Sequence, residues 1–226
     1  MKFEELAGMI DHSILLPATT DSELKKGCQL AADYQVYSVC VRPAHAAPAK
    51  KLLAGTGVRV GTVIAFPHGG SKPHVKAYEI KAALEDGVKE VDLVLNIGAL
   101  LSGNYSLLEL ELREAADTAH WGGALLKVIL ETGYLNRAQK IKACQLARES
   151  GADYVKTSTG FGPSGATLAD ISLMKKTVGP KMGVKAAGGI RTLEETLAMI
   201  NAGASRIGTS STKDILDEFK RKSRAI

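Results

Sequence analysis

Cysteine, aromatic residues and long apolar runs are all scarce in this sequence. The three cysteines, Cys28, Cys40 and Cys144, lie far apart and match no zinc, redox or disulfide spacing, which is typical of a protein kept in a reducing compartment. No run approaches the roughly 18 apolar residues that a membrane span needs. Acidic residues lie near Met1, where a signal peptide needs an apolar core. We therefore expect a soluble, cytoplasmic protein with no membrane partner.

Patterns that bind metals or nucleic acids are missing as well. The five histidines show no metal-ligand spacing, so we expect no metal site, and we interpret His12 as structural and Cys40 as a buried, inert thiol. The formal charge is +5, and cations gather only at Lys220-Arg221-Lys222-Ser223-Arg224. Because no aromatic residue adjoins this run, it indicates the last turn of a helix rather than a nucleic-acid partner. A modest positive excess suits a small anionic substrate.

What is present is an alternation of short apolar runs and longer amphipathic segments, repeated about eight times. The runs predict strands at residues 9–15, 37–41, 58–66, 90–97, 125–131, 154–159, 182–187 and 206–209. The segments predict helices at residues 21–34, 43–54, 73–86, 105–120, 136–150, 167–177, 193–202 and 212–222. No linker or composition break divides them, so residues 1–226 are predicted to form a single-domain (β/α)₈ barrel of the α/β class. An open doubly wound sheet is the alternative, but it would usually have a glycine-rich first turn.

Local signals support the helix boundaries. Four residues are placed to cap helix N-termini, and a glutamate three residues after the last of them completes a capping box: Asp21, Asn136, Thr167, Thr192 and Glu195. Three glycines end helices and are placed to adopt the left-handed C-cap conformation: Gly87, Gly151 and Gly203. Most predicted strands are continuously apolar, as expected for a parallel sheet that helices cover.

Charged residues interrupt the predicted strands on one face. Side chains alternate faces along a strand, so Asp92, Lys127, Lys156 and Lys185 are all expected inside the barrel. A buried ion-pair network that fixes the strand register is one interpretation. Desolvation offsets most of the benefit of such a network, however, and two lysines beside one acid form an unbalanced set. A second ammonium group in a low-dielectric wall depresses the pKa of a lysine, which then attacks carbonyls and forms a Schiff base.

Glycine and hydroxyl residues follow the sixth, seventh and eighth predicted strands. Gly188 and Gly189 follow the seventh strand, and Gly208-Thr209-Ser210-Ser211 ends the eighth. Barrels commonly bind phosphate at these two loops, through backbone N–H groups at helix N-termini. Thr157-Ser158-Thr159-Gly160 is predicted to continue the same rim. Ser210 and Ser211 lack a His–Asp partner in the sequence, so a serine hydrolase has little support.

These residues make the chain resemble the deoxyribose-phosphate aldolases, a family of Schiff-base-forming class I aldolases. The resemblance covers nearly the whole length. It rests on seven segments: Ile10-Asp11-His12, Phe66-Pro67, Glu90-Val91-Asp92-Leu93-Val94-Leu95-Asn96-Ile97-Gly98, Leu126-Lys127-Val128-Ile129-Leu130-Glu131-Thr132, Val155-Lys156-Thr157-Ser158-Thr159-Gly160, Lys185-Ala186-Ala187-Gly188-Gly189-Ile190-Arg191 and Gly208-Thr209-Ser210. The Lys-Thr-Ser-Thr-Gly motif is the most specific of them.

The resemblance implies an activity and a set of roles. The expected reaction is the reversible cleavage of 2-deoxy-D-ribose 5-phosphate to D-glyceraldehyde 3-phosphate and acetaldehyde, in deoxyribonucleoside catabolism. Lys156 would form the Schiff base, and Asp92 and Lys185 would relay protons. Six residues would hold the phosphate: Gly160, Gly188, Gly189, Gly208, Ser210 and Ser211. No cofactor would be needed, and a homodimer or homotetramer is expected.

The sequence departs from the family pattern at three places. Ser13 replaces a threonine that is frequent in the family, and His68 follows Phe66-Pro67 where leucine is usual. The sequence ends Arg224-Ala225-Ile226 where some members have a tyrosine that reaches the active site, so we expect no such contribution. Two alternatives remain open at this point. One is a Schiff-base barrel aldolase for another phosphosugar, and the other is a non-catalytic phosphosugar-binding protein.

Overall fold

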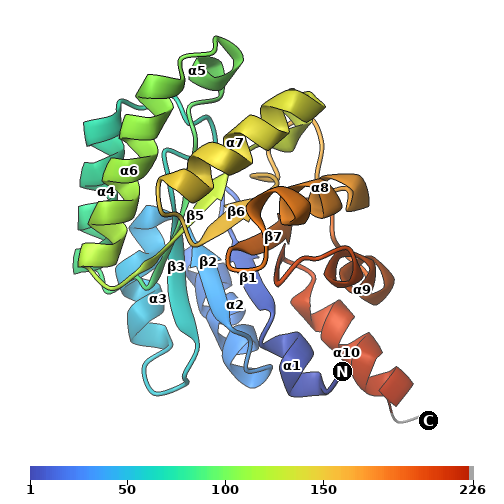
Figure 1. Ribbon diagram of the computed structural model, residues 1–226. Coiled ribbons are helices and arrows are strands. Elements are labelled where there is room, and N and C mark those ends of the chain that lie inside the picture. Colours follow the sequence, from blue (N-terminus) through green and yellow to red (C-terminus); the bar gives the residue numbers. More distant parts are fainter. Residues whose placement is uncertain (224–226) are drawn as a thin grey trace.

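Eight parallel strands close into a barrel in the computed structural model, which describes residues 1–223 (Figure 1). Each strand pairs with its neighbours in chain order, and β1 pairs with β8 to close the sheet. The strands are β1 (Ile10–Ile14), β2 (Ser38–Val41), β3 (Arg59–Ile64), β4 (Glu90–Val94), β5 (Leu125–Ile129), β6 (Tyr154–Lys156), β7 (Gly183–Ala187) and β8 (Arg206–Thr209). The predicted barrel is therefore confirmed, and the open sheet is wrong.

Helices surround the barrel and connect its strands (Figure 1). They are α1 (Phe3–Ala7), α2 (Asp21–Asp33), η1 (Pro43–His45), α3 (Ala46–Leu52), α4 (Pro73–Glu85), α5 (Ile97–Leu101), α6 (Tyr105–Trp121), η2 (Thr132–Tyr134), α7 (Arg137–Glu149), α8 (Leu168–Val178), α9 (Leu193–Asn201) and α10 (Thr212–Ser223). The prediction missed α1 and α5, because a helix of five residues is too short to show a periodic pattern. The predicted helix 43–54 is instead η1 followed by α3.

Three of the four predicted N-cap residues cap their helices in the structure. Asn136, Thr167 and Thr192 cap their helices as predicted, each accepting a hydrogen bond from the third helical residue. Asp21 was the wrong residue, because the cap of α2 is Thr20, whose hydroxyl accepts a hydrogen bond from the Glu23 amide at 3.3 Å. The C-terminal glycines of α4, α7 and α9 have positive φ as predicted: Gly87, Gly151 and Gly203.

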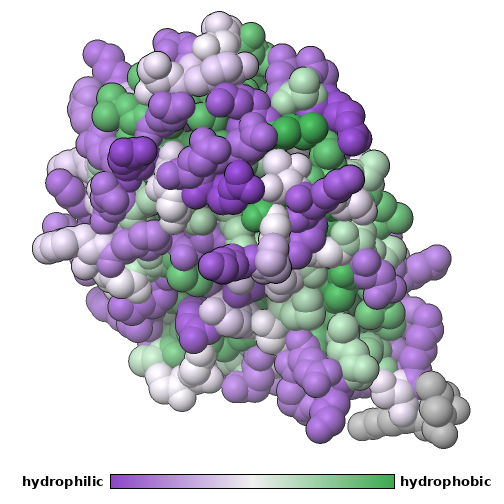
Figure 2. Space-filling model, in the orientation of Figure 1, coloured by the Kyte–Doolittle hydropathy of each residue, from purple (hydrophilic) through white to green (hydrophobic). Residues whose placement is uncertain are grey.

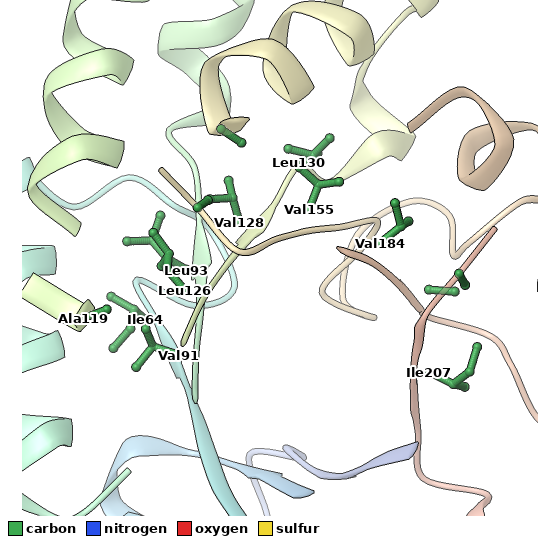
Figure 3. Packing of buried hydrophobic residues seen from close by; sticks show 14 of the residues in the cluster. Ile64, Val91, Leu93, Ala119, Leu126, Val128, Leu130, Val155, Val184 and Ile207 are labelled. Atoms are coloured by element: carbon green, nitrogen blue, oxygen red, sulfur yellow. The ribbon is translucent and has the colours of Figure 1, made fainter. Parts of the chain in front are cut away.

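The hydrophobic core lies outside the barrel, between the strands and the helices. Strand residues of the outward-facing set, together with Ala119 of α6 and Leu130 beyond β5, belong to this buried core and are labelled in Figure 3: Ile64, Val91, Leu93, Ala119, Leu126, Val128, Leu130, Val155, Val184 and Ile207. Their alternate neighbours on the same strands face the barrel interior. The interior residues Cys40, Val63, Val94 and Ile129 are buried but do not belong to this core cluster. The helices can therefore be held by apolar burial while the interior carries charge.

Small residues make room for large polar ones inside the barrel. A Cβ atom on Gly183 would lie 2.1 Å from the ring of Tyr154, its register partner on β6. A Cβ atom on Gly208 would lie 3.0 Å from Cε of Lys185 on the neighbouring strand β7. Glycine is thus required at both positions because a larger side chain would collide with Tyr154 or Lys185, and not because of the backbone conformation. The charged side chains of the interior depend on them.

The ends of the described chain lie close together. Helix α1 lies beside α10, and the rings of Phe3 and Phe219 are 6.5 Å apart (Figure 1). Lys220, Arg221 and Lys222 occupy the last turn of α10, as the sequence predicted, whereas Arg224 and the expectation about a C-terminal tyrosine fall outside the described residues. Between residues 1 and 223 there is no helix with the length and apolarity needed to cross a membrane.

Candidate active site

The barrel interior holds a connected set of buried charges. Its centre is Asp92 on β4, which is 1% exposed. Oxygen Oδ2 of Asp92 accepts hydrogen bonds from Nζ of Lys156 on β6 and Nζ of Lys185 on β7, each at 2.8 Å. Oxygen Oδ1 accepts one from Nζ of Lys127 on β5 at 3.0 Å. The structure therefore brings together all four charged strand residues that the sequence singled out.

The register explains why these side chains meet. Asp92 is directly opposite Lys127 across the β4–β5 pair, and Lys156 is directly opposite Lys185 across the β6–β7 pair. All four point inward because side chains alternate faces along each strand. Asp92 thus contacts its register partner Lys127 and both members of the Lys156–Lys185 pair. Oδ2 of Asp92 also bridges the two neighbouring lysines, because it accepts a hydrogen bond from both Lys156 and Lys185.

The set contains more acid than the sequence predicted. The expectation of two lysines beside a single acid is wrong, because Asp11 on β1 lies 2.6 Å from Nζ of Lys185 and Glu90 on β4 lies 2.7 Å from Nζ of Lys127. Arg206 on β8 joins these two acids, at 2.9 Å from Asp11 and 3.4 Å from Glu90. Among the described residues the set therefore comprises three carboxylates and four cations.

Burial and mutual attraction act against each other on these groups. Burial alone would raise the pKa of Asp92, but the charges of Lys127, Lys156 and Lys185 hold it well below its ordinary value. Burial would likewise lower the pKa of Lys185, but the charges of Asp11 and Asp92 outweigh it and raise that pKa. The pKa of Lys127 is raised in the same way, against burial, by Asp92 and Glu90. Lys127 and Lys185 are therefore held as ammonium ions.

A cleft of about 480 Å³ lies at the carboxyl ends of strands β1, β6, β7 and β8. Lys156 lines it, whereas Lys127 and Lys185 are not part of its wall. Its wall also includes Thr159, Gly160, Gly188, Gly189, Gly208 and Ser210. Lys156 and five of the six residues expected to hold a phosphate therefore line the same cleft.

The sixth predicted phosphate residue, Ser211, is not part of the cleft wall. It directly precedes α10, and its amide donates a hydrogen bond to the Thr209 hydroxyl at 2.9 Å. Gly160, Gly188 and Gly189 all have positive φ, a backbone conformation that favours glycine. Their amides, with the exposed Ser210, remain as candidate donors to an anion.

The loop after β6 divides into a buried part and a part that reaches the cleft. Thr157 and Ser158 are fully buried, so the expectation that they line the rim is wrong. The Thr157 hydroxyl instead donates to the Ala187 carbonyl at 2.9 Å and accepts from the Ala187 amide at 3.0 Å. The Thr159 amide and hydroxyl both donate to the carboxylate of Glu131, which holds the loop over β5. These bonds connect β5, β6 and β7 at the edge of the cleft.

His12 and Cys40 have the environments expected of structural groups. Nδ1 of His12 lies 2.8 Å from the Thr212 hydroxyl, and burial lowers the pKa of His12 to about 4. Burial raises the pKa of Cys40 to about 11, and the negative charge of Asp92 adds to this effect. His12 also borders the cleft. In residues 1–223 no group of three or more His, Cys, Asp or Glu side chains could hold a metal ion.

Comparison with known proteins identifies the family to which this chain belongs. The family model described as DeoC/LacD family aldolase matches residues 6–218. A curated deoxyribose-phosphate aldolase of Thermococcus gammatolerans is 52% identical over 215 residues, covering 94% of this chain and 96% of the relative. The chain belongs to the DeoC/LacD aldolase family.

Solved structures of aldolases have the same fold. The structure described as "QR15, an Aldolase" has a TM-score of 0.93 and 39% identity, and the match covers 98% of this chain and 99% of the other. A second, described as a unique tetrameric structure of deoxyribose phosphate aldolase from Aeropyrum pernix, has a TM-score of 0.90 and 33% identity over 97% of this chain and 92% of the other. The family resemblance drawn from the sequence is therefore confirmed.

The loop after β3, where this DeoC/LacD family chain departs from the common pattern, is held in place at two points. Phe66 meets Phe161 of the β6 loop edge to face, with ring centroids 5.5 Å apart. Gly69 has positive φ, and a Cβ atom there would lie 2.1 Å from the Leu95 carbonyl oxygen. His68 between these points is exposed. The departure thus changes a surface side chain, while the residues around it still join β3 to the rim.

Sequence reasoning missed three members of the charged set: Asp11, Glu90 and Arg206. Glu90 shares a strand face with Asp92, so the alternation of faces was a signal that could have found it. Asp11 was noted beside His12 without an interior role. Arg206 opens β8, where a charge at the first strand residue gives no hint of burial, although the side chain is only 4% exposed.

Proposed function

We propose that Lys156 is the Schiff-base nucleophile of a deoxyribose-phosphate aldolase reaction in this chain. The reaction reversibly cleaves 2-deoxy-D-ribose 5-phosphate to D-glyceraldehyde 3-phosphate and acetaldehyde. The observation that carries the proposal is that Lys156 lines the cleft while its Nζ lies 2.8 Å from Asp92, a carboxylate shared with Lys185. A lysine amine in such a wall adds to carbonyls.

The chemistry follows from the amine. Nζ of Lys156 adds to the C1 aldehyde of the open-chain sugar, and the carbinolamine loses water to give a protonated imine. Because C3 carries the hydroxyl β to that imine, loss of the hydroxyl proton breaks the C2–C3 bond, and its electrons move through C2 to the imine nitrogen. Glyceraldehyde 3-phosphate leaves. The remaining enamine is protonated at C2, and water then releases acetaldehyde and the free amine.

Asp92 and Lys185 are proposed as the partners that move protons in these steps. Oδ2 of Asp92 contacts Nζ of both lysines at 2.8 Å, so a proton that leaves Lys156 or the carbinolamine has an acceptor and a donor within hydrogen-bond distance. Because the pKa of Lys185 is raised, Lys185 carries a proton at neutral pH that it can share through Asp92. This pairing supports a relay rather than a second nucleophile.

The phosphate of the substrate is proposed to bind at the opposite side of the cleft from β4. Backbone amides of three glycines in the cleft wall are the proposed donors: Gly160, Gly188 and Gly189. Gly208 and Ser210 belong to the same wall, and Ser211 is the residue after Ser210. Arg191 also lines the cleft and supplies positive charge. The formal charge of +5 favours the approach of a phosphosugar.

The cellular context is proposed in the same terms. We place the enzyme in the cytoplasm, in the breakdown of deoxyribonucleosides, with a phosphosugar as its small-molecule partner and neither nucleic acid nor membrane as a further partner. We also propose that the chain, as one domain over residues 1–226, assembles into a homodimer or homotetramer. The mass of the particle in solution tests that assembly.

Reductive trapping tests the nucleophile. Treatment with acetaldehyde and borohydride is expected to attach one ethyl group to Lys156, because hydride reduces the imine to a stable secondary amine. Peptide mass spectrometry locates the group. The variant Lys156→Arg, which keeps a positive charge but cannot form an imine, should remain unlabelled.

Lys181→Arg serves as the matched control, because Lys181 is an exposed lysine outside the cleft. It should be labelled at Lys156 to the same extent as the unmodified chain. Labelling that persists in Lys156→Arg, or that is found mainly on Lys185 or Lys127, would overturn the assignment of the nucleophile.

A further inference from the structure

The buried charges form a closed ring of alternating sign. Six contacts link the members in turn, with distances of 2.9, 2.6, 2.8, 3.0, 2.7 and 3.4 Å. In that order the ring runs Arg206, Asp11, Lys185, Asp92, Lys127, Glu90 and back to Arg206. Three carboxylates alternate with three cations, so the ring is neutral. Every cation in it contacts two carboxylates.

Lys156 is the remaining cation of the set, and it lies outside this ring. Within residues 1–223 its one salt bridge is to Oδ2 of Asp92, an oxygen that already contacts Lys185. A proton lost from Lys156 leaves the neutral ring intact. A proton lost from Lys185 or Lys127 would instead leave two carboxylates short of a partner in a medium where unpaired charge is costly.

We propose that the ring keeps Lys127 and Lys185 charged and leaves Lys156 as the one lysine that releases its proton, with Glu90 and Arg206 acting as positioning residues. The inference rests on the proposed role of Lys156 as nucleophile. Neither Glu90 nor Arg206 contacts Lys156 among the polar contacts of the described chain. Both therefore act on Lys156 through the charge of the ring.

Two tyrosines show that Arg206 is held in its ring position. Its guanidinium carbon lies 3.4 Å from the ring centroid of Tyr37 and 5.4 Å from that of Tyr154. Gly183 leaves the space that the Tyr154 ring fills. The pKa of Arg206 is raised, against burial, by Asp11 and Glu90. Arg206 is thus a fixed positive charge.

The ring meets few other titratable groups. β3 faces it with no ionisable side chain, since Arg59 is exposed and its guanidinium carbon lies 4.3 Å from the centroid of the Tyr37 ring. On β2 the nearest is Cys40, whose Sγ is 3.9 Å from Asp92 and whose raised pKa keeps it a neutral thiol. The other ionisable groups that face the ring are Tyr37, which directly precedes β2, and Tyr154 and Lys156 on β6.

The pH dependence of trapping tests the ring by opposite changes of charge. The rate of ethyl incorporation at Lys156 would be followed with acetaldehyde and cyanoborohydride between about pH 5 and about pH 10. Arg206→Gln removes a positive charge, so Lys156 holds its proton more firmly, and the midpoint of the profile should rise by about one pH unit. Glu90→Gln removes a negative charge and should lower the midpoint by about one pH unit.

Two kinds of control variant accompany these single variants: a double variant that restores the net charge, and substitutions that keep the charge of each residue. The double variant Glu90→Gln/Arg206→Gln has the original net charge, so its midpoint should return to that of the unmodified chain. Arg206→Lys and Glu90→Asp keep each charge and should leave the midpoint in place. A purely structural role would lower the rate in all variants without moving midpoints in opposite directions.

The outcomes separate this proposal from the proposed function. If the unmodified chain is not labelled at Lys156, the nucleophile assignment fails and the ring proposal fails with it. If it is labelled but both single variants keep its midpoint, or both move in one direction, the ring proposal alone fails. Circular dichroism would verify folding, and Asp11→Asn, which also removes a ring carboxylate, replaces Glu90→Gln if that variant does not fold.

Discussion

At the scale of single residues, burial has opposite consequences for the charged groups and for His12. Asp92, Lys127 and Lys185 stay ionised because each has charged partners within 3.0 Å. Among residues 1–223, the hydrogen-bond partner of the His12 side chain is the uncharged Thr212 hydroxyl at 2.8 Å, so burial dominates and lowers the pKa of His12 to about 4. Burial therefore leaves Asp92, Lys127 and Lys185 charged, because they have charged partners, and leaves His12 neutral.

His12 should make the stability of the protein dependent on pH in a defined window. Its pKa rises from about 4 in the folded chain to 6.5 in the unfolded one, so the unfolded state binds more protons. The contribution is complete above pH 6.5 and is lost as the pH falls toward 4. Between pH 7 and pH 5 the free energy of unfolding should fall by about 2 kcal/mol more than in His12→Gln, as measured by urea denaturation. Equal losses in both proteins would contradict this.

At the scale of elements, a second buried ion pair joins two helices to the end of β4. Nζ of Lys76 on α4 lies 2.8 Å from Glu111 Oε2 on α6, and both side chains are fully buried. Lys76 also donates to the Val94 carbonyl at 2.8 Å, and the Asn96 amide donates to Glu111 at 3.0 Å. Burial lowers the pKa of Lys76 and raises that of Glu111, against their mutual attraction. The pair holds the segment just beyond Asp92.

Removing half of this pair should cost more than removing all of it. Lys76→Met leaves Glu111 buried without its cation, and the free energy of unfolding should fall by about 3–5 kcal/mol. The double variant Lys76→Met/Glu111→Leu removes the unpaired charge and should lie within about 2 kcal/mol of the unmodified chain, the remainder reflecting the lost bonds to Val94 and Asn96. Urea denaturation measures both. Additive costs in the double variant would show that the two residues act independently.

At the scale of the whole molecule, the outside is mixed in character. Figure 2 shows a face on which hydrophilic side chains are interspersed with hydrophobic ones. Several large apolar side chains project from the outer helices, with Trp121 at 87% and Tyr78 at 73% exposure. Exposed aromatic residues of this size are typical of protein–protein interfaces. The similar chain from Aeropyrum pernix is described as tetrameric.

The particle in solution should therefore be larger than one chain. Light scattering after size-exclusion chromatography should give a mass of two or four times 23.9 kDa at micromolar concentration. The temperature of unfolding should rise with protein concentration, because association stabilises the folded state by mass action. A particle of 23.9 kDa whose unfolding temperature is independent of concentration would contradict the proposed assembly.

Much of the fold could be predicted because the signals for it are local. The alternation of apolar runs and amphipathic segments, the caps at Asn136, Thr167 and Thr192, and the glycine at the end of α7 all depend on residues within a few positions of one another. The short helices and the early ends of β4 and β6 were missed. Five-residue helices have no period to detect, and an apolar run does not reveal where strand pairing stops.

The sequence by itself determined that lysines stand inside strands, and Lys156 in Lys-Thr-Ser-Thr-Gly was singled out for that reason. Only the tertiary structure decided which charges meet. Asp11 and Arg206 are 195 residues apart in the chain, yet they lie 2.9 Å apart because β1 pairs with β8 when the barrel closes. Barrel closure and register, which no local pattern encodes, turned an apparent excess of lysine into a neutral ring with one cation, Lys156, beside the cleft.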